Sequence, residues 1–337
     1  MIVIPGLNPG SRVFVFPGPW TLEPGHCPLY FMASAANESF CYRHKGVNIA
    51  DTVPQKTRQQ KMPNDTDHKK RIQQGFDTVA AGYDHPSLSF FPETAKRLVE
   101  HLELEPHQHL LDVCTGTGVV ALTAAEKLTR GKVTGIDLSS GMLQQAINKA
   151  AEKNLGNIEF KQMDLEHLDL DTVNQGAAYD IATSSFGLFF LEDMTRGLSN
   201  IAGTVKPGGK VAITSFTGEA FSPMADIFVK RYESTGREVP PLSWKRLATR
   251  EVIKQQFNAV NITNVNIYHE PFGYQMTDPQ MWWDVVWNAG WRSLLNQMTE
   301  EEQKVFEQEH MEEIAAVVGN DGVWFNTEVL IAIGEKQ

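Results

Sequence analysis

The sequence predicts an α/β fold, with a doubly wound, mostly parallel sheet of seven strands, helices on both faces and a helical lid insertion. Two observations support this prediction. Apolar runs of strand length alternate with segments of helical periodicity between residues 109 and 216, which is typical of a parallel sheet with crossover helices. A glycine-rich turn also separates the first apolar run from the helical segment behind it. Such a turn lets a ligand approach the backbone closely, beside the free N–H groups of a helix start.

The expected elements follow from this alternation. Strands are expected at 109–114, 132–137, 158–163, 179–184, 210–216, 263–269 and 328–334. Helices are expected at 65–82, 92–104, 119–130, 139–153 and 192–204. Because the first two helices precede the first strand, they can pack over the edge of the sheet where a ligand would lie.

Two insertions interrupt the later strands. Residues 217–257 are expected to be a helical cap. Residues 271–326 are rich in aromatic side chains and are expected to form a helical lid that walls an apolar pocket. In this second insertion we expect one helix over 278–297, with three tryptophans on one face: Trp283, Trp287 and Trp291. The spacing of Thr299 and Glu302 predicts a capping box at the start of the next helix.

The first 61 residues differ from the rest of the chain. They hold seven of the 17 prolines and show neither helical nor strand periodicity. We therefore expect residues 1–61 to be a poorly ordered or appended extension of a domain that occupies residues 62–337.

Composition excludes several classes of function. The net charge is −11 and no basic stripe is visible, which argues against a nucleic-acid partner. No apolar run reaches the length of about 18 residues that a membrane span needs. The three cysteines are irregularly spaced and predict neither a disulfide framework nor a metal site. The N-terminus lacks the basic region of a signal peptide, so a cytoplasmic location is expected, whereas the oligomeric state stays open.

The turn at Thr115–Gly118 fits two kinds of ligand. Gly116-x-Gly118-x-x-Ala121 satisfies the loose fingerprint of a dinucleotide site, and Asp137, at the end of the next strand, is suited to gripping a ribose diol. The second ligand is S-adenosylmethionine. Asp112 favours it, because a carboxylate would repel a pyrophosphate but attract the sulfonium and ammonium groups of the methionine end. Alternatively, Asp112 only caps the following turn.

Further motifs follow at the ends of successive strands, and with them the sequence resembles the class I S-adenosylmethionine-dependent methyltransferases. The resemblance covers about residues 70–335 and is greatest to the ubiquinone/menaquinone-biosynthesis methyltransferases and their small-molecule relatives. Its motifs are Leu-Asp112-Val-Cys-Thr-Gly-Thr-Gly118, Gly-Ile-Asp137-Leu-Ser-Ser-Gly-Met-Leu143, Met163-Asp-Leu-Glu-His-Leu168, Tyr179-Asp-Ile-Ala-Thr-Ser-Ser-Phe-Gly187 and Phe76-Asp-Thr-Val-Ala-Ala-Gly-Tyr-Asp84. The implied fold is the Rossmann-like methyltransferase fold, with an antiparallel last strand. Cys114 stands where the family more commonly has a glycine, and the quinone enzymes lack the long segment 271–326.

The resemblance implies a role for each residue of the series. Thr115, Gly116, Thr117 and Gly118 would hold the methionine part, beside Asp112. Asp137 would bind the ribose hydroxyls, and Leu138 and Met142 would flank the adenine. Asp164 would accept the adenine amino group, Leu165 would pack beside the ring, and Ser185 would lie near the transferred methyl group. No residue is implied to bind a metal.

The expected reaction is transfer of a methyl group from S-adenosylmethionine to a small, largely apolar or aromatic acceptor by in-line displacement. If the acceptor must lose a proton, Tyr83, His85 and His269 are candidates for the base. The acceptor and the atom that is methylated stay open. Two other functions also stay open: an NAD(P)-dependent oxidoreductase, and a module that binds S-adenosylmethionine without catalysis.

Overall fold

The structure, a computed structural model, describes residues 65–337, with side chains from His68 onward. The chain divides into two units, Met1–Lys61 and Met62–Gln337, and the described residues all belong to the second. The prediction for residues 1–61 lies outside the described residues. In the described part of the chain, no helix has both the length and the apolar character needed to cross a membrane.

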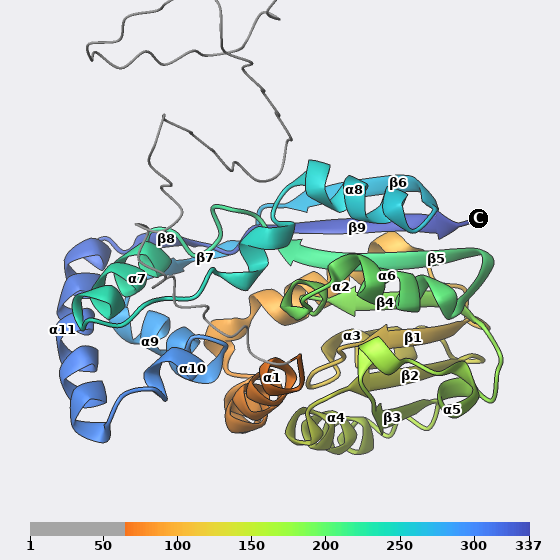
Figure 1. The fold of residues 1–337 in the computed structure, drawn as a ribbon, viewed down its shortest axis with the longest axis horizontal. Helices are drawn as coiled ribbons and strands as arrows, with labels where there is room; N and C mark the ends of the chain where they lie inside the picture. Colours follow the sequence, from red (N-terminus) through yellow and green to blue (C-terminus); the bar gives the residue numbers. More distant parts are fainter. Residues whose placement is uncertain (1–64) are drawn as a thin grey trace, which may run out of the picture. The chain divides into compact units, whose positions relative to one another are not determined.

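A seven-stranded sheet forms the centre of the described unit (Figure 1). Its spatial order is β3 (Ile158–Gln162), β2 (Lys132–Asp137), β1 (His109–Val113), β4 (Tyr179–Ser185), β5 (Val205–Phe216), β9 (Val329–Lys336) and β6 (Ile262–Glu270). The pairs from β3 to β5 are parallel, whereas β9 runs antiparallel to both of its neighbours. The predicted fold class is therefore confirmed, including its antiparallel last strand.

Helices cover both faces of this sheet. Those that pack on its strands are α2 (Phe90–Leu102), α3 (Val119–Ala125), α4 (Ser140–Glu152), α6 (Met194–Gly203) and α8 (Arg250–Ala259). Helix α1 (Asp65–Val79) packs on α4, α5 (Leu170–Asn174) lies between β3 and β4 in the chain, and α7 (Met224–Ser234) packs on α11 (Glu300–Val318) (Figure 1). Alternate residues of one strand serve the two faces. Leu110 of β1 packs in the core with α2 and α3, and Leu111 packs in the larger core with α6. This burial on both faces explains why adjacent positions of β1, Leu110 and Leu111, are both apolar.

The second insertion differs from its prediction in two ways. The expected single helix over 278–297 is wrong, because α9 (Pro279–Asn288) ends before Ala289, whose backbone is extended, and α10 (Arg292–Leu295) starts after Gly290. The insertion is also not wholly helical. Strands β7 (Gly273–Met276) and β8 (Val323–Asn326) pair antiparallel as a separate small sheet. The capping box is confirmed: Thr299 and Glu302 begin α11 (Glu300–Val318).

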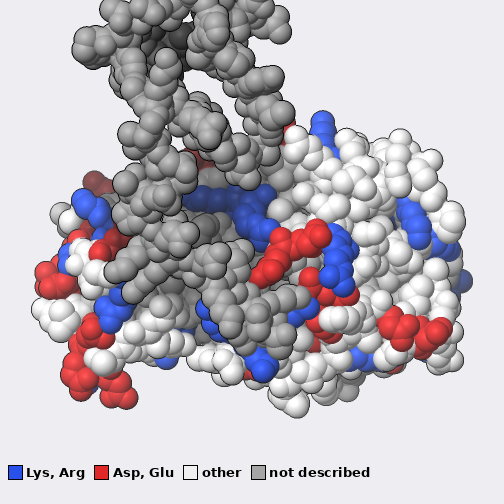
Figure 2. Space-filling view, in the orientation of Figure 1, with Lys and Arg blue, Asp and Glu red and all other residues white. Residues whose placement is uncertain are grey.

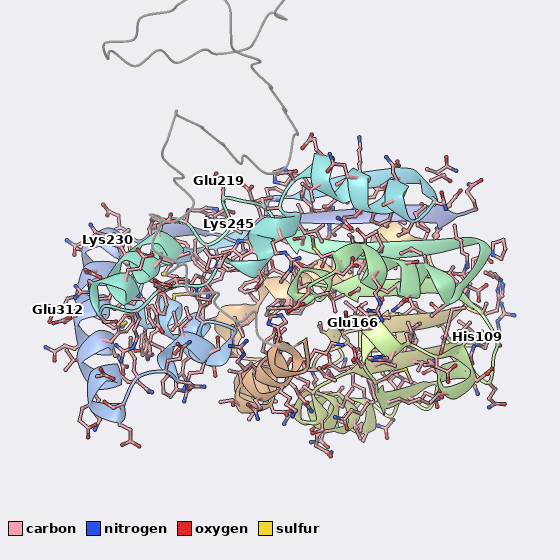
Figure 3. The ribbon with its side chains drawn as sticks, viewed as in Figure 1. His109, Glu166, Glu219, Lys230, Lys245 and Glu312 are labelled. Atoms are coloured by element: carbon pink, nitrogen blue, oxygen red, sulfur yellow. The ribbon has the colours of Figure 1, made fainter. Side chains whose placement is uncertain are left out.

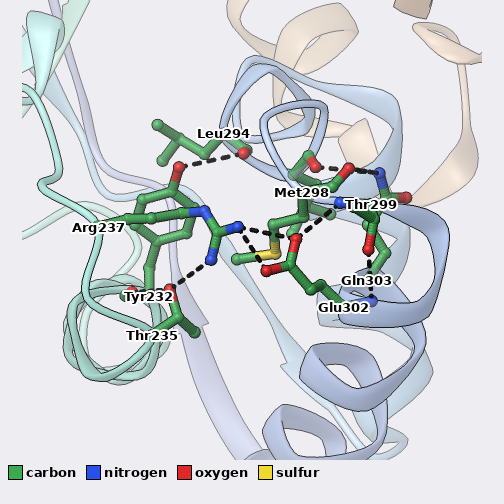
Figure 4. A network of polar contacts seen from close by, with 9 residues as sticks. Tyr232, Thr235, Arg237, Leu294, Met298, Thr299, Glu302 and Gln303 are labelled. Carbon is green, nitrogen blue, oxygen red and sulfur yellow. Dashed lines mark hydrogen bonds and ion pairs between the residues drawn. The ribbon is translucent and has the colours of Figure 1, made fainter.

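Polar contacts join the two insertions into one body (Figure 4). Arg237, from the first insertion, donates from Nη2 to both carboxylate oxygens of Glu302 at 2.8 Å. The Tyr232 hydroxyl donates to the carbonyl of Leu294 at 3.2 Å and thereby fixes the position of α10. On the face shown in Figure 2, acidic side chains gather where α11 lies, and this helix carries seven glutamates.

Candidate functional site

The glycine turn lies between β1 and α3, at the point where the strand order reverses. The backbone N–H of Thr115 donates to the Ile136 carbonyl at 2.9 Å, and that of Gly118 donates to the Thr115 carbonyl at 2.8 Å. Gly118 has a φ of 83°. A Cβ on Gly118 would lie 2.9 Å from the Cβ of Ala146 and 3.2 Å from the ring of Phe160. Glycine is therefore required here so that α4 and β3 can pack against the turn.

Cys114 occupies the first position of the turn with a φ of 57°, a conformation that favours glycine. Its side chain packs against Gly187 at the end of β4: a Cβ on Gly187 would lie 2.5 Å from the Cβ of Cys114. Burial raises the pKa of the Cys114 thiol, with smaller contributions from the carboxylates of Asp137 and Asp112. Cys114 is thus a neutral packing group, as its small size predicts.

Asp112 is buried beside the turn. Its carboxylate accepts hydrogen bonds from the hydroxyls of Thr115 at 2.6 Å and Thr183 at 2.7 Å. Burial raises the pKa of Asp112 to about 6, although the two threonine hydroxyls oppose the shift. The carboxylate therefore holds the turn in place through Thr115 and also lines the cavity described below.

Asp137 ends β2 and accepts two backbone N–H groups. The N–H of Gly116 lies 2.8 Å from Oδ2, and that of Ser139 lies 2.8 Å from Oδ1. Burial raises the pKa of Asp137, although these N–H donors oppose the shift. The carboxylate thus connects the glycine turn to the start of α4.

Asp164 follows β3 and caps a short helical turn, with the Glu166 N–H donating to its Oδ1 at 2.9 Å. Lys69 from α1 lies 3.0 Å from its Oδ2, and His167 contacts the same oxygen at 2.9 Å. Burial acts to raise the pKa of Asp164, but the Glu166 N–H, His167 and Lys69 outweigh it and the pKa falls. Lys69 also forms an ion pair with Glu166, which lies near α1 in Figure 3, well away from His109 at the amino end of β1.

A cavity of about 340 Å³ opens at the edge of the sheet formed by the carboxyl ends of the parallel strands. We call it the edge cavity. It is lined by all but one of the residues predicted to bind the cofactor: Asp112, Thr115, Gly116, Thr117, Asp137, Leu138, Met142, Asp164, Leu165 and Ser185. Gly118 is the exception, because it faces Ala146 and Phe160 and not the cavity. Residues separated by 73 positions in the sequence therefore meet at one edge, as parallel strands require.

Helix α1 covers the edge cavity and supplies wall residues that the sequence analysis did not name, among them Ile72 and Phe76. Asp77 ties this helix to the start of α4, because its Oδ1 accepts from the Ser139 hydroxyl at 2.5 Å and the Gly141 N–H at 2.9 Å. His68 contacts the Phe190 carbonyl at 3.2 Å. The helical periodicity predicted α1 itself, but its polar partners lie too far along the chain for a local pattern to reveal them.

Two of the three candidate bases, Tyr83 and His85, line the edge cavity, and the third does not. Tyr83 lines the edge cavity, but burial raises the pKa of its phenol, helped by the carboxylates of Asp137 and Asp84, so it remains protonated. His85 also lines the cavity, yet its Nδ1 accepts from the Ser87 N–H at 3.3 Å and its Nε2 lies 3.9 Å from Asp284.

His269 is the third candidate, and it lies elsewhere. It stands on the outermost strand β6, 3.1 Å from Glu328, and lines neither this cavity nor the one described next. Its suggested role as a base is therefore corrected. Strand β6 pairs with β9 at the far side of the sheet, a placement that the order of elements in the sequence does not reveal.

A second cavity of about 180 Å³ adjoins the first, and we call it the aromatic cavity. Its walls come from the segment before β1, from the ends of β4 and β5, and from both insertions. It shares five aromatic residues with the edge cavity: Phe76, Tyr83, Phe91, Phe186 and Phe190. Its other lining residues include Trp244 and Trp291, and no charged side chain among the described residues lines it.

The three tryptophans predicted to share one helix face do not do so, because the break at Gly290 intervenes. Trp291 lines the aromatic cavity, whereas Trp283 packs with Trp287 outside it, at a ring distance of 6.2 Å. Arg292 lies 3.0 Å over the Trp287 ring. Only one of the three therefore serves the cavity.

Comparisons with known proteins agree with this architecture. A family model described as a methyltransferase domain matches residues 110–209. The chain is 30% identical over 198 residues to aklanonic acid methyltransferase DauC of Streptomyces sp. (strain C5), which covers 58% of this chain and 86% of DauC. It is 25% identical over 228 residues to demethylmenaquinone methyltransferase of Bacteroides fragilis, covering 62% of this chain and 91% of that enzyme. The crystal structure of YjhP from E. coli shares the fold with a TM-score of 0.50 at 17% identity, covering 77% of this chain and 98% of YjhP.

A doubly wound sheet with a cavity at its switch point is the arrangement of the Rossmann-like folds. The chain belongs to the S-adenosylmethionine-dependent methyltransferases. It is an enzyme of this class, and its cofactor is S-adenosylmethionine.

Proposed function

We propose that this enzyme transfers a methyl group from S-adenosylmethionine in the edge cavity to a small, largely apolar or aromatic acceptor in the aromatic cavity. The observation that carries this proposal is the junction of the two cavities. Five uncharged aromatic residues belong to both, so the two cavities meet at an apolar boundary where a group held in one would reach a group held in the other.

The residues of the edge cavity fit the cofactor. Asp112 and the turn Thr115–Gly118 lie where the methionine part would be held, and Asp137 offers a carboxylate to the ribose hydroxyls. Leu138, Met142 and Leu165 supply apolar surface for the adenine, and Asp164 supplies an acceptor for its amino group. Bound S-adenosylmethionine supplies an already activated methyl group, so the protein has only to align the partners and keep water out.

We propose that the five aromatic residues shared by the two cavities, which we call the aromatic junction, keep water away from the reacting groups. Tyr83 stacks on Phe91 at a ring distance of 5.0 Å, and Phe91 meets Phe186 edge-on at 5.3 Å. Phe76 contacts both Tyr83 and Phe190, at 6.1 and 5.3 Å. These contacts link the five rings into one apolar row at the boundary of the two cavities, and this row would limit the access of water to the reacting groups.

Neither Tyr83 nor His85, the two candidate bases at the edge cavity, is placed to remove a proton from the acceptor. The Tyr83 phenol stays protonated and can donate a hydrogen bond, while both ring nitrogens of His85 face groups of the protein. We propose that the acceptor brings a nucleophile that is already ionised or that carries a free lone pair. Tyr83 then acts through orientation and not through proton removal.

The two insertions form the proposed lid. Residues 239–244 of the first and Val285, Ala289, Trp291 and Leu294 of the second line the aromatic cavity. The domain assignment 62–337, with caps at 217–257 and 271–326, is part of this proposal, as is a cytoplasmic location. We also propose that nucleic acid is not the acceptor, in keeping with the net charge of −11.

Turnover tests the proposal directly. The full chain is incubated with S-adenosylmethionine and a panel of phenols, quinols, amines and carboxylates, and release of S-adenosylhomocysteine is measured. The matched variant Ala289→Phe places a ring in the aromatic cavity only, so it should lose turnover and keep the thermal stabilisation by S-adenosylhomocysteine. Full turnover in this variant would show that the acceptor binds elsewhere.

The same assay separates the two other functions. An oxidoreductase would be stabilised by NAD(H), and a non-catalytic binding module would be stabilised by S-adenosylmethionine yet release no product with any acceptor. The family assignment already argues against the first, and turnover with one acceptor of the panel would exclude the second.

A further inference from the structure

A short loop after β4 contributes side chains to both cavities, and we call residues 187–192 the β4 loop. Phe190 lines the edge cavity and the aromatic cavity. Phe189 lines only the aromatic cavity, whereas Leu191 and Glu192 line only the edge cavity. Because consecutive residues serve different cavities, a displacement of this loop would change the shape of both at once.

Arg246 holds the backbone of the β4 loop from the side of the first insertion. Its Nη1 donates to the carbonyls of Phe189 at 3.1 Å and Leu191 at 2.6 Å, and its Nη2 donates to the carbonyl of Glu192 at 2.9 Å. Arg246 belongs to the short helical turn Ser243–Leu247, which packs on the β4 loop. One guanidinium therefore ties three carbonyls of the loop to the first insertion.

The segment that carries Arg246 also forms one wall of the aromatic cavity. Residues 239–244, which come directly before it in the chain, all line that cavity. Within the described part of the chain, the only hydrogen bonds that join residues 239–248 to another segment are those of Arg246. The polar connection between this wall and the β4 loop therefore depends on one side chain.

Helix α1 holds the same loop from the side of the edge cavity. Its residue His68 lines that cavity and lies, through Nε2, 3.2 Å from the carbonyl of Phe190. The four successive carbonyls of residues 189–192 are thus bound by side chains from two elements, one beside each cavity. A cofactor that fills the edge cavity contacts both α1 and the β4 loop, and so it should restrict the movement of the loop.

We propose that Arg246 is a positioning residue that couples the two cavities. Binding of the cofactor fixes the β4 loop, and Arg246 transmits this restriction to the wall of the aromatic cavity. Arginine suits the task because its planar guanidinium presents several donors in a fixed geometry. The inference rests on the proposed function, and it adds that the acceptor cavity is fully formed only when the cofactor is bound.

Hydrogen exchange in the full chain tests this coupling without a known acceptor. Exchange of backbone amides is followed by mass spectrometry with and without saturating S-adenosylhomocysteine, in peptides that cover the β4 loop and residues 242–248. Arg246→Met removes the guanidinium but keeps a long side chain, and Arg246 is exposed, so the fold should persist. Arg250→Met is the matched control, because Arg250 is also exposed but donates to the Ile267 carbonyl of β6, which lines neither cavity.

We expect S-adenosylhomocysteine to slow exchange in the β4 loop of all three proteins. In residues 242–248 it should slow exchange about fivefold or more in the parent and in Arg250→Met, as is typical of coupled sites, and have no effect in Arg246→Met. Equal protection of residues 242–248 in the parent and in Arg246→Met, or no protection of this segment in the parent, would overturn the assignment.

The outcomes also distinguish this inference from the proposed function. If residues 242–248 are protected equally in the parent and in Arg246→Met, the role of Arg246 is wrong, while the acceptor site still depends on the turnover of Ala289→Phe. If S-adenosylhomocysteine stabilises the parent but slows exchange in neither segment, the cofactor binds away from the β4 loop, and the proposed function fails together with the inference. Thermal stabilisation of all three proteins by S-adenosylhomocysteine confirms that the variants are folded.

Discussion

The buried carboxyl group of Asp112 predicts that binding of S-adenosylmethionine depends on pH. Burial holds the pKa of Asp112 near 6, above its ordinary value of 3.8. In the proposed site the ionised carboxylate attracts the sulfonium and ammonium groups of the cofactor, and the protonated form does not. Affinity should therefore fall as the pH is lowered through the pKa of Asp112.

The magnitude follows from the pKa. With a pKa of about 6, Asp112 is almost fully ionised near pH 7.5 and only about one-tenth ionised near pH 5. If the ionised form alone binds, the affinity falls about tenfold over this interval, which corresponds to about 1.4 kcal/mol. The bound cation favours the ionised form, so binding near pH 6 should also release protons.

Isothermal titration calorimetry measures both effects. The affinity of the full chain for S-adenosylmethionine is determined between about pH 7.5 and about pH 5, in two buffers that differ in ionisation heat. Asp112→Asn keeps an acceptor oxygen for one of the two threonine hydroxyls and presents an N–H donor to the other. It cannot ionise, so its affinity should be lower and independent of pH. An affinity that stays constant over the interval in the parent, or that falls equally in parent and Asp112→Asn, would refute the electrostatic role of Asp112.

Two further predictions concern stability. Gly187→Ala should destabilise the fold by about 1–3 kcal/mol, since its Cβ would lie 2.5 Å from that of Cys114, and adding Cys114→Gly should restore most of the loss; additive effects in urea unfolding would disprove this contact. His310 is fully buried, and burial lowers its pKa to about 4 against the raising effect of Glu313. Since the unfolded chain takes up this proton first, about 3 kcal/mol of stability should be lost as the pH falls from 6.5 to 4. His310→Gln should show a flatter dependence, and parallel curves would contradict the assignment.

The sequence predicted the sheet and the edge cavity well, because both depend on local patterns. Strands β1 and β2 each have a buried apolar centre that ends in a polar or glycine-rich segment, and parallel strands bring their carboxyl ends together whatever lies between them. Asp112, Asp137 and Asp164 therefore line one cavity, as expected. The capping box of α11 was equally local, since both of its partners lie within one helical turn.

Features that depend on contacts between distant parts of the chain could not be predicted from local patterns. The break at Gly290 is one residue within a helical pattern, and it moves Trp291 from the face it was expected to share to the aromatic cavity. His269 follows an ordinary strand pattern, but β6 lies beyond β9 at the edge of the sheet. The carbonyls that Arg246 holds lie 54, 55 and 57 positions before it in the chain, so no local pattern could reveal them.

Thermal unfolding with and without S-adenosylmethionine tests the central claim most directly, which is that the carboxylates at the edge of the sheet hold this cofactor. At about 100 times the dissociation constant the ligand should add about 2.7 kcal/mol of stability to the parent, and NAD should add none. Asp137→Ala should lose this stabilisation, and Glu219→Ala, which changes a carboxylate that does not line either cavity, should keep it. An Asp137→Ala variant that melts at a higher temperature with S-adenosylmethionine, by as much as the parent does, would contradict the account.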